Sequence, residues 1–125
     1  MKHEAKYNTD LNRYLRDKKM YCFYELKYTG NVDSFQFAKI RKVQWDGAIA
    51  TEKNGLVWKF SDEISRPKPC DGVSIPPLPS YLIIKFSSEF VFIRFEKIEE
   101  LRNEGVISIS RKTAEEISEK IIKLN

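Results

Sequence analysis

The amino-acid sequence predicts an α+β fold in which helices flank a mixed central sheet of about five strands. Apolar residues recur with a helical period in several segments, and short aromatic and β-branched runs lie between them. Turn-forming Gly, Pro, Asn and Ser separate these segments. A chain of 125 residues is long enough for one core and too short for two, so we expect residues 1–125 to form a single domain.

The predicted helices begin near the N-terminus. Residues 3–16 carry apolar side chains at the spacing of one helical face: Tyr7, Leu11, Tyr14 and Leu15. A second helix is expected from Ser34, a suitable N-cap, to about Glu52. It would carry Gln44 on the same face as its apolar stripe.

The C-terminal tail is expected to be helical in two pieces. The first is short and covers residues 97–102. The second begins at Arg111, after Ser110 as its N-cap, and continues toward the end of the chain. Its apolar stripe consists of Ala114, Ile117, Ile121 and Leu124.

Five runs predict strands. They are residues 20–28, 56–60, 70–75, 81–86 and 90–95. The run at 70–75 ends at Pro76-Pro77, and we expect it to pair with 56–60. Residues 87–89 join the last two runs and predict a hairpin whose second strand is a candidate sheet edge.

Residues 20–28 are unusual because Glu25 and Lys27 interrupt an otherwise apolar and aromatic run. Side chains alternate across a strand, so the two charges share one face and their neighbours Tyr24 and Leu26 share the other. Such a pair is either a structural ion pair or part of a site that cleaves phosphodiesters, where it binds a metal ion and stabilises charge.

Basic residues surround this strand. The chain has 22 Lys and Arg against 18 Asp and Glu, a formal net charge of +4. The basic clusters are Lys18 and Lys19 before the strand, Lys39, Arg41 and Lys42 after it, and Lys59, Arg66 and Lys68 in the following segment. Each cluster is either a solvated surface or a set of phosphate contacts, and their position around one strand favours nucleic-acid binding.

Composition argues against several other classes of protein. Cys22 and Cys70 lack a CxxC spacing and neighbouring histidines, so we expect reduced thiols and no zinc site. His3 is the single histidine, and no Gly-rich phosphate loop or Gly-x-Ser-x-Gly elbow occurs. No apolar stretch reaches the roughly 20 residues of a membrane span, and no signal-peptide pattern follows the N-terminus. We therefore expect a cytoplasmic protein without a membrane partner.

The Glu-x-Lys strand is followed by further motifs in a definite order. The motifs are Tyr24-Glu25-Leu26-Lys27-Tyr28-Thr29, then Ser34-Phe35-Gln36-Phe37, then Gln44, then the hairpin at 81–95. This order resembles the PD-(D/E)XK nuclease superfamily, and within it the RecU-type Holliday junction resolvases and their phage-borne relatives. The resemblance extends from about Glu4 to Phe95 and implies a restriction-endonuclease-like fold.

The sequence departs from the superfamily pattern at one point. The metal-binding Asp of these nucleases lies on a strand just before the Glu-x-Lys strand, and no such strand is predicted here. The pair 56–60 and 70–75 would replace it as a permuted hairpin, and Pro69-Cys70-Asp71 resembles the Pro-x-Asp element. The resemblance thus implies Asp71 as a metal ligand, whereas its local alternative is an Asx-turn residue beside Gly72.

The resemblance also assigns chemical roles. Asp71 and Glu25, helped by Glu4 from the first helix, would bind Mg²⁺ or Mn²⁺ through oxygen ligands. Lys27 would orient the attacking water or offset charge in the transition state. Gln44 would position water or phosphate, unless it is simply a polar residue at the edge of its helix.

The function that this implies is a metal-dependent DNA endonuclease acting on branched DNA, such as a Holliday junction, in recombination and repair. A non-catalytic nucleic-acid-binding module on the same fold is the alternative, with exposed aromatics stacking on bases. A structural or protein-interaction domain is a third possibility. Paired cuts in a junction further predict a two-fold homodimer, formed through strand 90–95 or the C-terminal apolar stripe.

Overall fold

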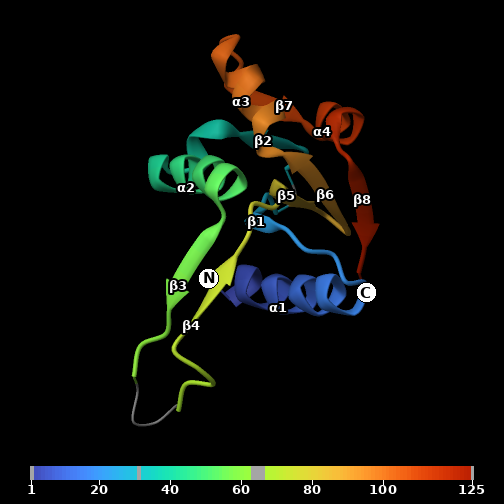
Figure 1. Ribbon diagram of the computed structural model, residues 1–125. Coiled ribbons are helices and arrows are strands. Elements are labelled where there is room, and N and C mark those ends of the chain that lie inside the picture. The colour runs from blue at the N-terminus through green and yellow to red at the C-terminus, as the bar shows by residue number, and fades with distance from the viewer. Residues whose placement is uncertain (1, 31, 63–66, 125) are drawn as a thin grey trace.

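The computed structural model describes residues 2–30, 32–62 and 67–124, and their side chains from Lys6 onward. The helices are α1 (Lys2–Asp17), α2 (Lys42–Asn54), α3 (Phe95–Asn103) and α4 (Arg111–Ile117), with a 3-10 turn η1 (Phe37–Lys39) before α2 (Figure 1). The strands are β1 (Phe23–Tyr28), β2 (Ser34–Gln36), β3 (Leu56–Lys59), β4 (Gly72–Ile75), β5 (Ser80–Phe86), β6 (Glu89–Arg94), β7 (Ser108–Ser110) and β8 (Lys120–Lys123).

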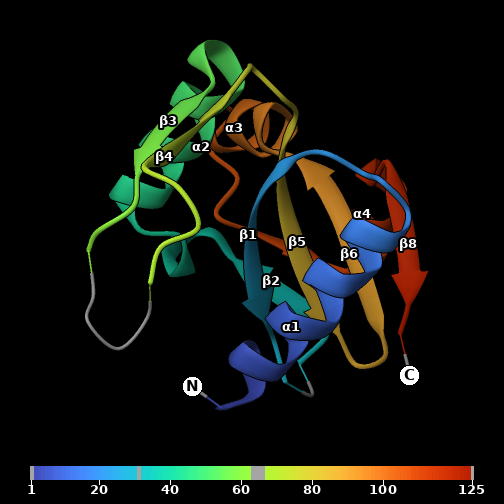
Figure 2. The same ribbon diagram turned by 60° about the horizontal axis from the view of Figure 1, so that its bottom comes forward.

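The central sheet has four strands in the order β1-β5-β6-β8. β1 runs parallel to β5, and the other neighbours are antiparallel. Helix α1 crosses one face, while α2, α3, α4 and the β2–β7 ribbon lie on the other (Figures 1 and 2). This arrangement confirms the predicted α+β class with a mixed sheet. In the described ranges, no helix has both the length and the apolarity needed to cross a membrane.

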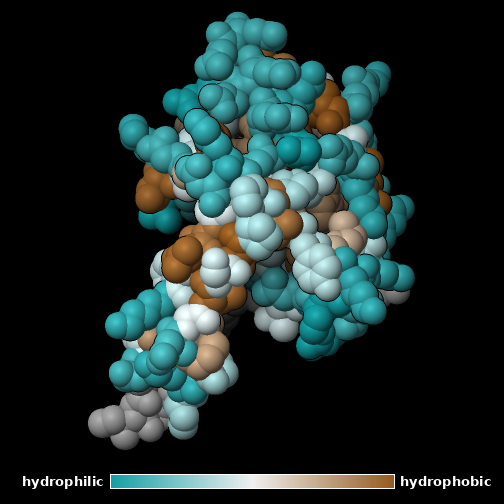
Figure 3. All heavy atoms as spheres, in the orientation of Figure 1, coloured by the Kyte–Doolittle hydropathy of each residue, from teal (hydrophilic) through white to brown (hydrophobic). Residues whose placement is uncertain are grey.

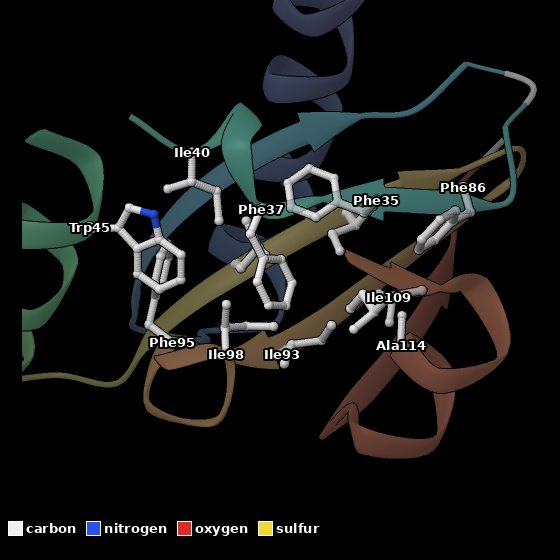
Figure 4. Packing of buried hydrophobic residues seen from close by; sticks show 13 residues of the cluster. Phe35, Phe37, Ile40, Trp45, Phe86, Ile93, Phe95, Ile98, Ile109 and Ala114 are labelled. Atoms are coloured by element: carbon white, nitrogen blue, oxygen red, sulfur yellow. The ribbon is translucent and has the colours of Figure 1, made fainter. Parts of the chain in front are cut away.

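Two hydrophobic clusters form on the two faces of the sheet because side chains alternate along β5 and β6. Leu82 and Ile84 point toward α2 and α3, where Phe35, Trp45 and Phe95 pack against them (Figure 4). Ile83, Phe90 and Phe92 point to the other face and pack against Leu11 and Leu15 of α1 and Leu26 of β1. Residues of β1 therefore alternate as predicted, with Leu26 in the α1 cluster and Glu25 on the α2 side.

Two predicted helices are wrong in extent. The second begins at Lys42 rather than Ser34, because residues 34–36 pair antiparallel with β7 and bury Phe35 opposite Ile109. The last helix ends at Ile117, and residues 120–123 instead form β8 along β6. Strand β6 is consequently paired on both sides, so residues 90–95 are not the sheet edge that we expected.

The hairpin of β3 and β4 pairs as predicted, but it forms a separate two-stranded sheet that projects from the body of the molecule (Figure 1). Its base needs Gly55, which has a φ of 76° and lies where any side chain would collide with the Ile75 carbonyl. Val57 and Trp58 are exposed on it, and Figure 3 shows a hydrophobic patch where the hairpin leaves the body. The central sheet therefore has four strands, not five, and the hairpin does not extend it.

Two half-buried tyrosines tie the central sheet to its flanks and provide a spectroscopic test of the packing. The Tyr24 hydroxyl donates to the Asn12 side chain of α1 at 2.5 Å, and burial raises the pKa of Tyr24 to about 12. The Tyr81 hydroxyl donates to Glu119 at 2.6 Å. Burial, the larger cause, and the Glu119 carboxylate, the smaller one, raise the pKa of Tyr81 to about 12. Both hydroxyls ordinarily have a pKa of 10.0.

We expect the free energy of unfolding to fall as the pH rises from 10 toward 12, because the unfolded chain releases these two protons first. Below pH 10 both hydroxyls stay protonated in the folded and the unfolded protein, so they cause no change of stability with pH there. Absorbance of tyrosinate in the folded protein should show a late step near pH 12. Tyr24→Phe should reduce that step and flatten the pH dependence of stability. A Tyr24→Phe profile that matches the wild type would contradict the burial of this hydroxyl.

Candidate functional site

The Glu25 carboxylate and the Lys27 ammonium lie side by side on the α2 face of β1. The Lys27 Nζ atom is 3.6 Å from Glu25 Oε1. The Glu25 side chain is 31% exposed and that of Lys27 is 15% exposed, so both are largely covered by protein while Glu25 remains accessible. A charge pair in this setting interacts more strongly than one on an open surface.

Gln44 holds this pair from the first turn of α2. Its side-chain Nε2 donates to Glu25 Oε1 at 2.6 Å, and its Oε1 accepts a hydrogen bond from the backbone N–H of Arg41 at 3.0 Å. The amide therefore caps the start of α2 and fixes the carboxylate at the same time. Because both of its polar ends are engaged, Gln44 acts here as a positioning residue for Glu25.

The adjacent Trp45 fixes the start of α2 against the core. It is 4% exposed, and its ring lies edge-on to Phe37 and Phe95 with centroid distances of 6.4 and 5.6 Å. Consecutive residues of the helix thus serve two purposes, since Trp45 anchors α2 while Gln44 reaches β1. The geometry of Glu25 depends on this anchor.

A cleft of about 260 Å³ opens between α2 and the starts of β1 and β5. Its lining includes Phe23, Glu25, Val43, Gln44, Thr51 and Ser80. Val43, which is 69% exposed, belongs to the same lining. The cleft has room for a phosphodiester group and is too small for a duplex, which would have to lie across its mouth.

A second network, which sequence reasoning missed, fixes the far end of the cleft. Arg94 Nη2 donates to Glu52 Oε1 at 2.5 Å, and the same carboxylate oxygen accepts the backbone N–H of Ser80 at 2.9 Å. Arg94 also pairs with Glu119 at 3.7 Å. The network ties the C-terminal half of α2 to β5 and β6. The sequence does show a charged residue, Arg94, at the end of a buried apolar run. It does not show the partners of Arg94, because they are remote in sequence.

The structure does not bring Asp71 to Glu25. Asp71 precedes β4 on the projecting hairpin, its side chain is 96% exposed, and it pairs with Lys68 at 3.2 Å. It lines a different cleft, with Trp58 and Lys59, which shares no residue with the Glu25 cleft. Since β3 and β4 pair with each other and not with β1, the permuted hairpin does not replace the missing strand.

Asp10 and Asp17 of α1 do not take its place. Asp10 and Asp17 line a shallow site with Tyr14 and Leu124, on the face of the sheet opposite Glu25. The side chain of Glu4 lies outside the described part of the chain, as does Arg66. Among the described side chains there is no group of three His, Cys, Asp or Glu residues arranged to bind a metal ion. Of the predicted metal ligands whose side chains are described, Glu25 therefore lines the cleft beside α2 and Asp71 does not.

The predicted phosphate contacts differ in whether they are already engaged in ion pairs. Lys39 and Arg41 are exposed just before α2 and make no ion pair with the described residues. Lys42 pairs with Asp46 at 2.7 Å, and Lys68 pairs with Asp62 and Asp71. Three further lysines are exposed at other places: Lys18 and Lys19 after α1, and Lys59 on the hairpin. Arg41 is linked to the Glu25 cleft because its backbone N–H donates to Gln44, which lines the cleft, and Lys39 lies two residues earlier in the chain.

Comparisons with protein-family models, curated proteins and solved structures find no match to this chain. The resemblance to the PD-(D/E)XK superfamily therefore stays a prediction, as do the activity and substrate that it implies.

Proposed function

We propose that this protein binds DNA across the Glu25 cleft and hydrolyses its phosphodiester bonds, most effectively in branched DNA such as a four-way junction. The observation that carries the proposal is the Glu25–Lys27 pair, held by Gln44 at a cleft of phosphate size that Glu25 and Gln44 line. The exposed Lys39 and Arg41 precede α2 and form no ion pair with the described residues. A simple structural ion pair needs neither the cleft nor the additional hydrogen bond from α2.

Metal binding fits this site in part. Mg²⁺ commonly uses one or two protein carboxylates together with water and substrate phosphate, and Glu25 has one oxygen that is not engaged by Gln44. Glu25 would be the ligand from this cleft. When bound, the ion would polarise the scissile phosphate and favour ionisation of a water molecule.

The residues of the chain have separate tasks in this proposal. Lys27 places a positive charge beside the phosphate, where negative charge grows in the transition state. Gln44 keeps Glu25 in one rotamer, so no reorganisation is needed when substrate arrives. Lys39 and Arg41 hold the flanking phosphates and thereby present one phosphodiester to the cleft.

A non-catalytic nucleic-acid-binding module is the second candidate. It is favoured by the position of Asp71, which leaves Glu25 without a second carboxylate among the described side chains. In that case the basic residues bind the backbone, and the Glu25–Lys27 pair orders β1.

A cleavage assay separates the two candidates. Junction, duplex and single-stranded DNA would be incubated with the protein in the presence of Mg²⁺, Mn²⁺ or EDTA. We expect metal-dependent cleavage that Glu25→Gln removes and Asp71→Ala leaves unchanged. Binding without cleavage of any substrate would instead establish the binding module. Loss of cleavage in Asp71→Ala would show that the hairpin reaches the cleft when DNA is bound.

We expect Lys39→Ala and Arg41→Ala each to weaken DNA binding and to reduce the slope of log K against log salt by about one unit. The reason is that each would remove one phosphate contact and the counterion release that accompanies it. Fluorescence anisotropy over a range of salt concentrations measures the slope. Lys112→Ala, at an exposed site on α4, is the matched control and should leave the slope unchanged. Equal slopes for all three variants and the wild type would place DNA on another surface.

A further inference from the structure

Strand β1 forms one edge of the central sheet, on the side away from β8 (Figure 2). The backbone N–H of Phe23 donates to Pro79 at 2.9 Å and that of Thr29 donates to Lys85 at 3.3 Å, so the odd-numbered residues direct their backbone groups to β5. By alternation, the N–H and C=O of Tyr24 and Leu26 point away from β5. In the described part of the chain no strand pairs with that side. Such an edge is a template for another strand.

The charges of β1 match a second copy of the same strand. In an antiparallel pair centred on Leu26, the two Leu26 residues face each other and exchange both backbone hydrogen bonds. Glu25 then lies directly opposite the partner's Lys27, and Lys27 lies opposite the partner's Glu25. A shift by one step in either direction would oppose two glutamates or two lysines, which is destabilising. The sequence around Leu26 therefore selects a single two-fold register.

The other edge of the sheet lacks this property. β8 consists of Lys120, Ile121, Ile122 and Lys123 and carries no carboxylate. Lysines on an edge strand oppose pairing with a second copy. The two edges thus differ in the way expected if one is used for association and the other is protected from it.

We propose that two copies associate through β1, antiparallel about a two-fold axis at Leu26, so that the partner's Lys27 lies beside Glu25. The pairing is isologous and would join the two central sheets into one. It would also add a second ammonium group to each Glu25, and the two clefts would lie next to each other at the dimer axis. The pairing itself needs neither metal nor nucleic acid. Its mass in solution is therefore measured separately from the cleavage assay, and either result can fail without deciding the other.

Charge reversal tests the pairing directly. Glu25→Lys alone opposes lysines at both positions, and Lys27→Glu alone opposes glutamates, so each variant should be monomeric. An equimolar mixture restores both attractions and should form a heterodimer. Sedimentation over a range of micromolar concentrations would show the mass double for the wild type and for the mixture. Lys112→Glu, a reversal at an exposed site on α4, should dimerise like the wild type.

Cysteine cross-linking keeps the test decisive if a reversed variant folds poorly. With Cys22 and Cys70 replaced by serine, Glu25→Cys and Lys27→Cys would be mixed and oxidised. Facing residues of a non-hydrogen-bonded pair have Cα atoms about 4.5 Å apart, which suits a disulfide. The mixture should therefore cross-link at least about ten-fold faster than either variant alone, whose cysteines lie on the diagonal. A monomeric wild type, or equal cross-linking in all three samples, would overturn the proposal.

Discussion

Lys27→Met is expected to lower the rate of DNA hydrolysis by about a hundred-fold or more while changing the affinity for DNA by less than about two-fold. The Lys27 ammonium lies 3.6 Å from the Glu25 carboxylate, and methionine keeps most of the length of lysine without the charge. Several exposed basic residues share the binding of the backbone, so the loss of one covered ammonium has little influence on affinity. Single-turnover cleavage and anisotropy on the same junction would measure the two effects separately.

The contrast with an exposed lysine makes this result specific. Lys39→Met should weaken binding and leave single-turnover cleavage at saturating protein nearly unchanged, which is the opposite pattern. If Lys27→Met reduced binding and cleavage by the same factor, Lys27 would be one more backbone contact and the assignment of a transition-state role would fail.

Trp45→Ala is expected to lower the free energy of unfolding by about 3–5 kcal/mol. Its ring is 4% exposed, contacts Phe37 and Phe95, and lies under the Arg102 guanidinium at 4.7 Å. Truncation would leave a cavity among the side chains of α2, α3 and the preceding 3-10 turn. The same change should loosen Gln44 and so reduce cleavage beyond the loss of folded protein.

The second tryptophan provides the control. Trp58 is 58% exposed on β3, and Trp58→Ala should change stability by less than about 0.5 kcal/mol. Urea unfolding followed by far-UV circular dichroism compares the variants without relying on tryptophan fluorescence. Equal destabilisation by the two substitutions would mean that the projecting hairpin packs against the body more firmly than the structure shows.

Local patterns in the sequence predicted much of this fold. Alternation around Glu25 identified β1 and its two faces, and residues 54–55 with Pro76-Pro77 delimited the hairpin of β3 and β4. The errors arose where short apolar runs fit more than one structure. Phe35 and Phe37 suited a helical stripe, yet pairing with β7 buries Phe35 from a strand. Likewise the spacing of Ile121 and Ile122 fits a helical stripe, but in the structure they belong to a strand that pairs with β6.

The candidate site, like the fold, could be predicted from the sequence only in part. Glu25 and Lys27 are two residues apart, so their proximity follows from strand geometry alone. Gln44 was singled out from the sequence, but its bond to Glu25 depends on how α2 packs on β1. Asp71 was misplaced because hairpin pairing does not determine where the hairpin lies relative to the sheet. Glu52 and Arg94 were missed because no local pattern connects them across the fold.

The hairpin of β3 and β4 has a consequence for the order of folding. β1 lies opposite β5 with Phe23 beside Ser80, so the chain between these strands must close as a long loop that includes α2 and the entire hairpin. β5 and β6, in contrast, meet across a tight turn and can pair early. We expect the transition state for folding to contain the β5–β6 pair and β1 to dock late, after the entropy of loop closure has been overcome. Shortening the hairpin at its tip should therefore speed folding modestly and leave the unfolding rate almost unchanged.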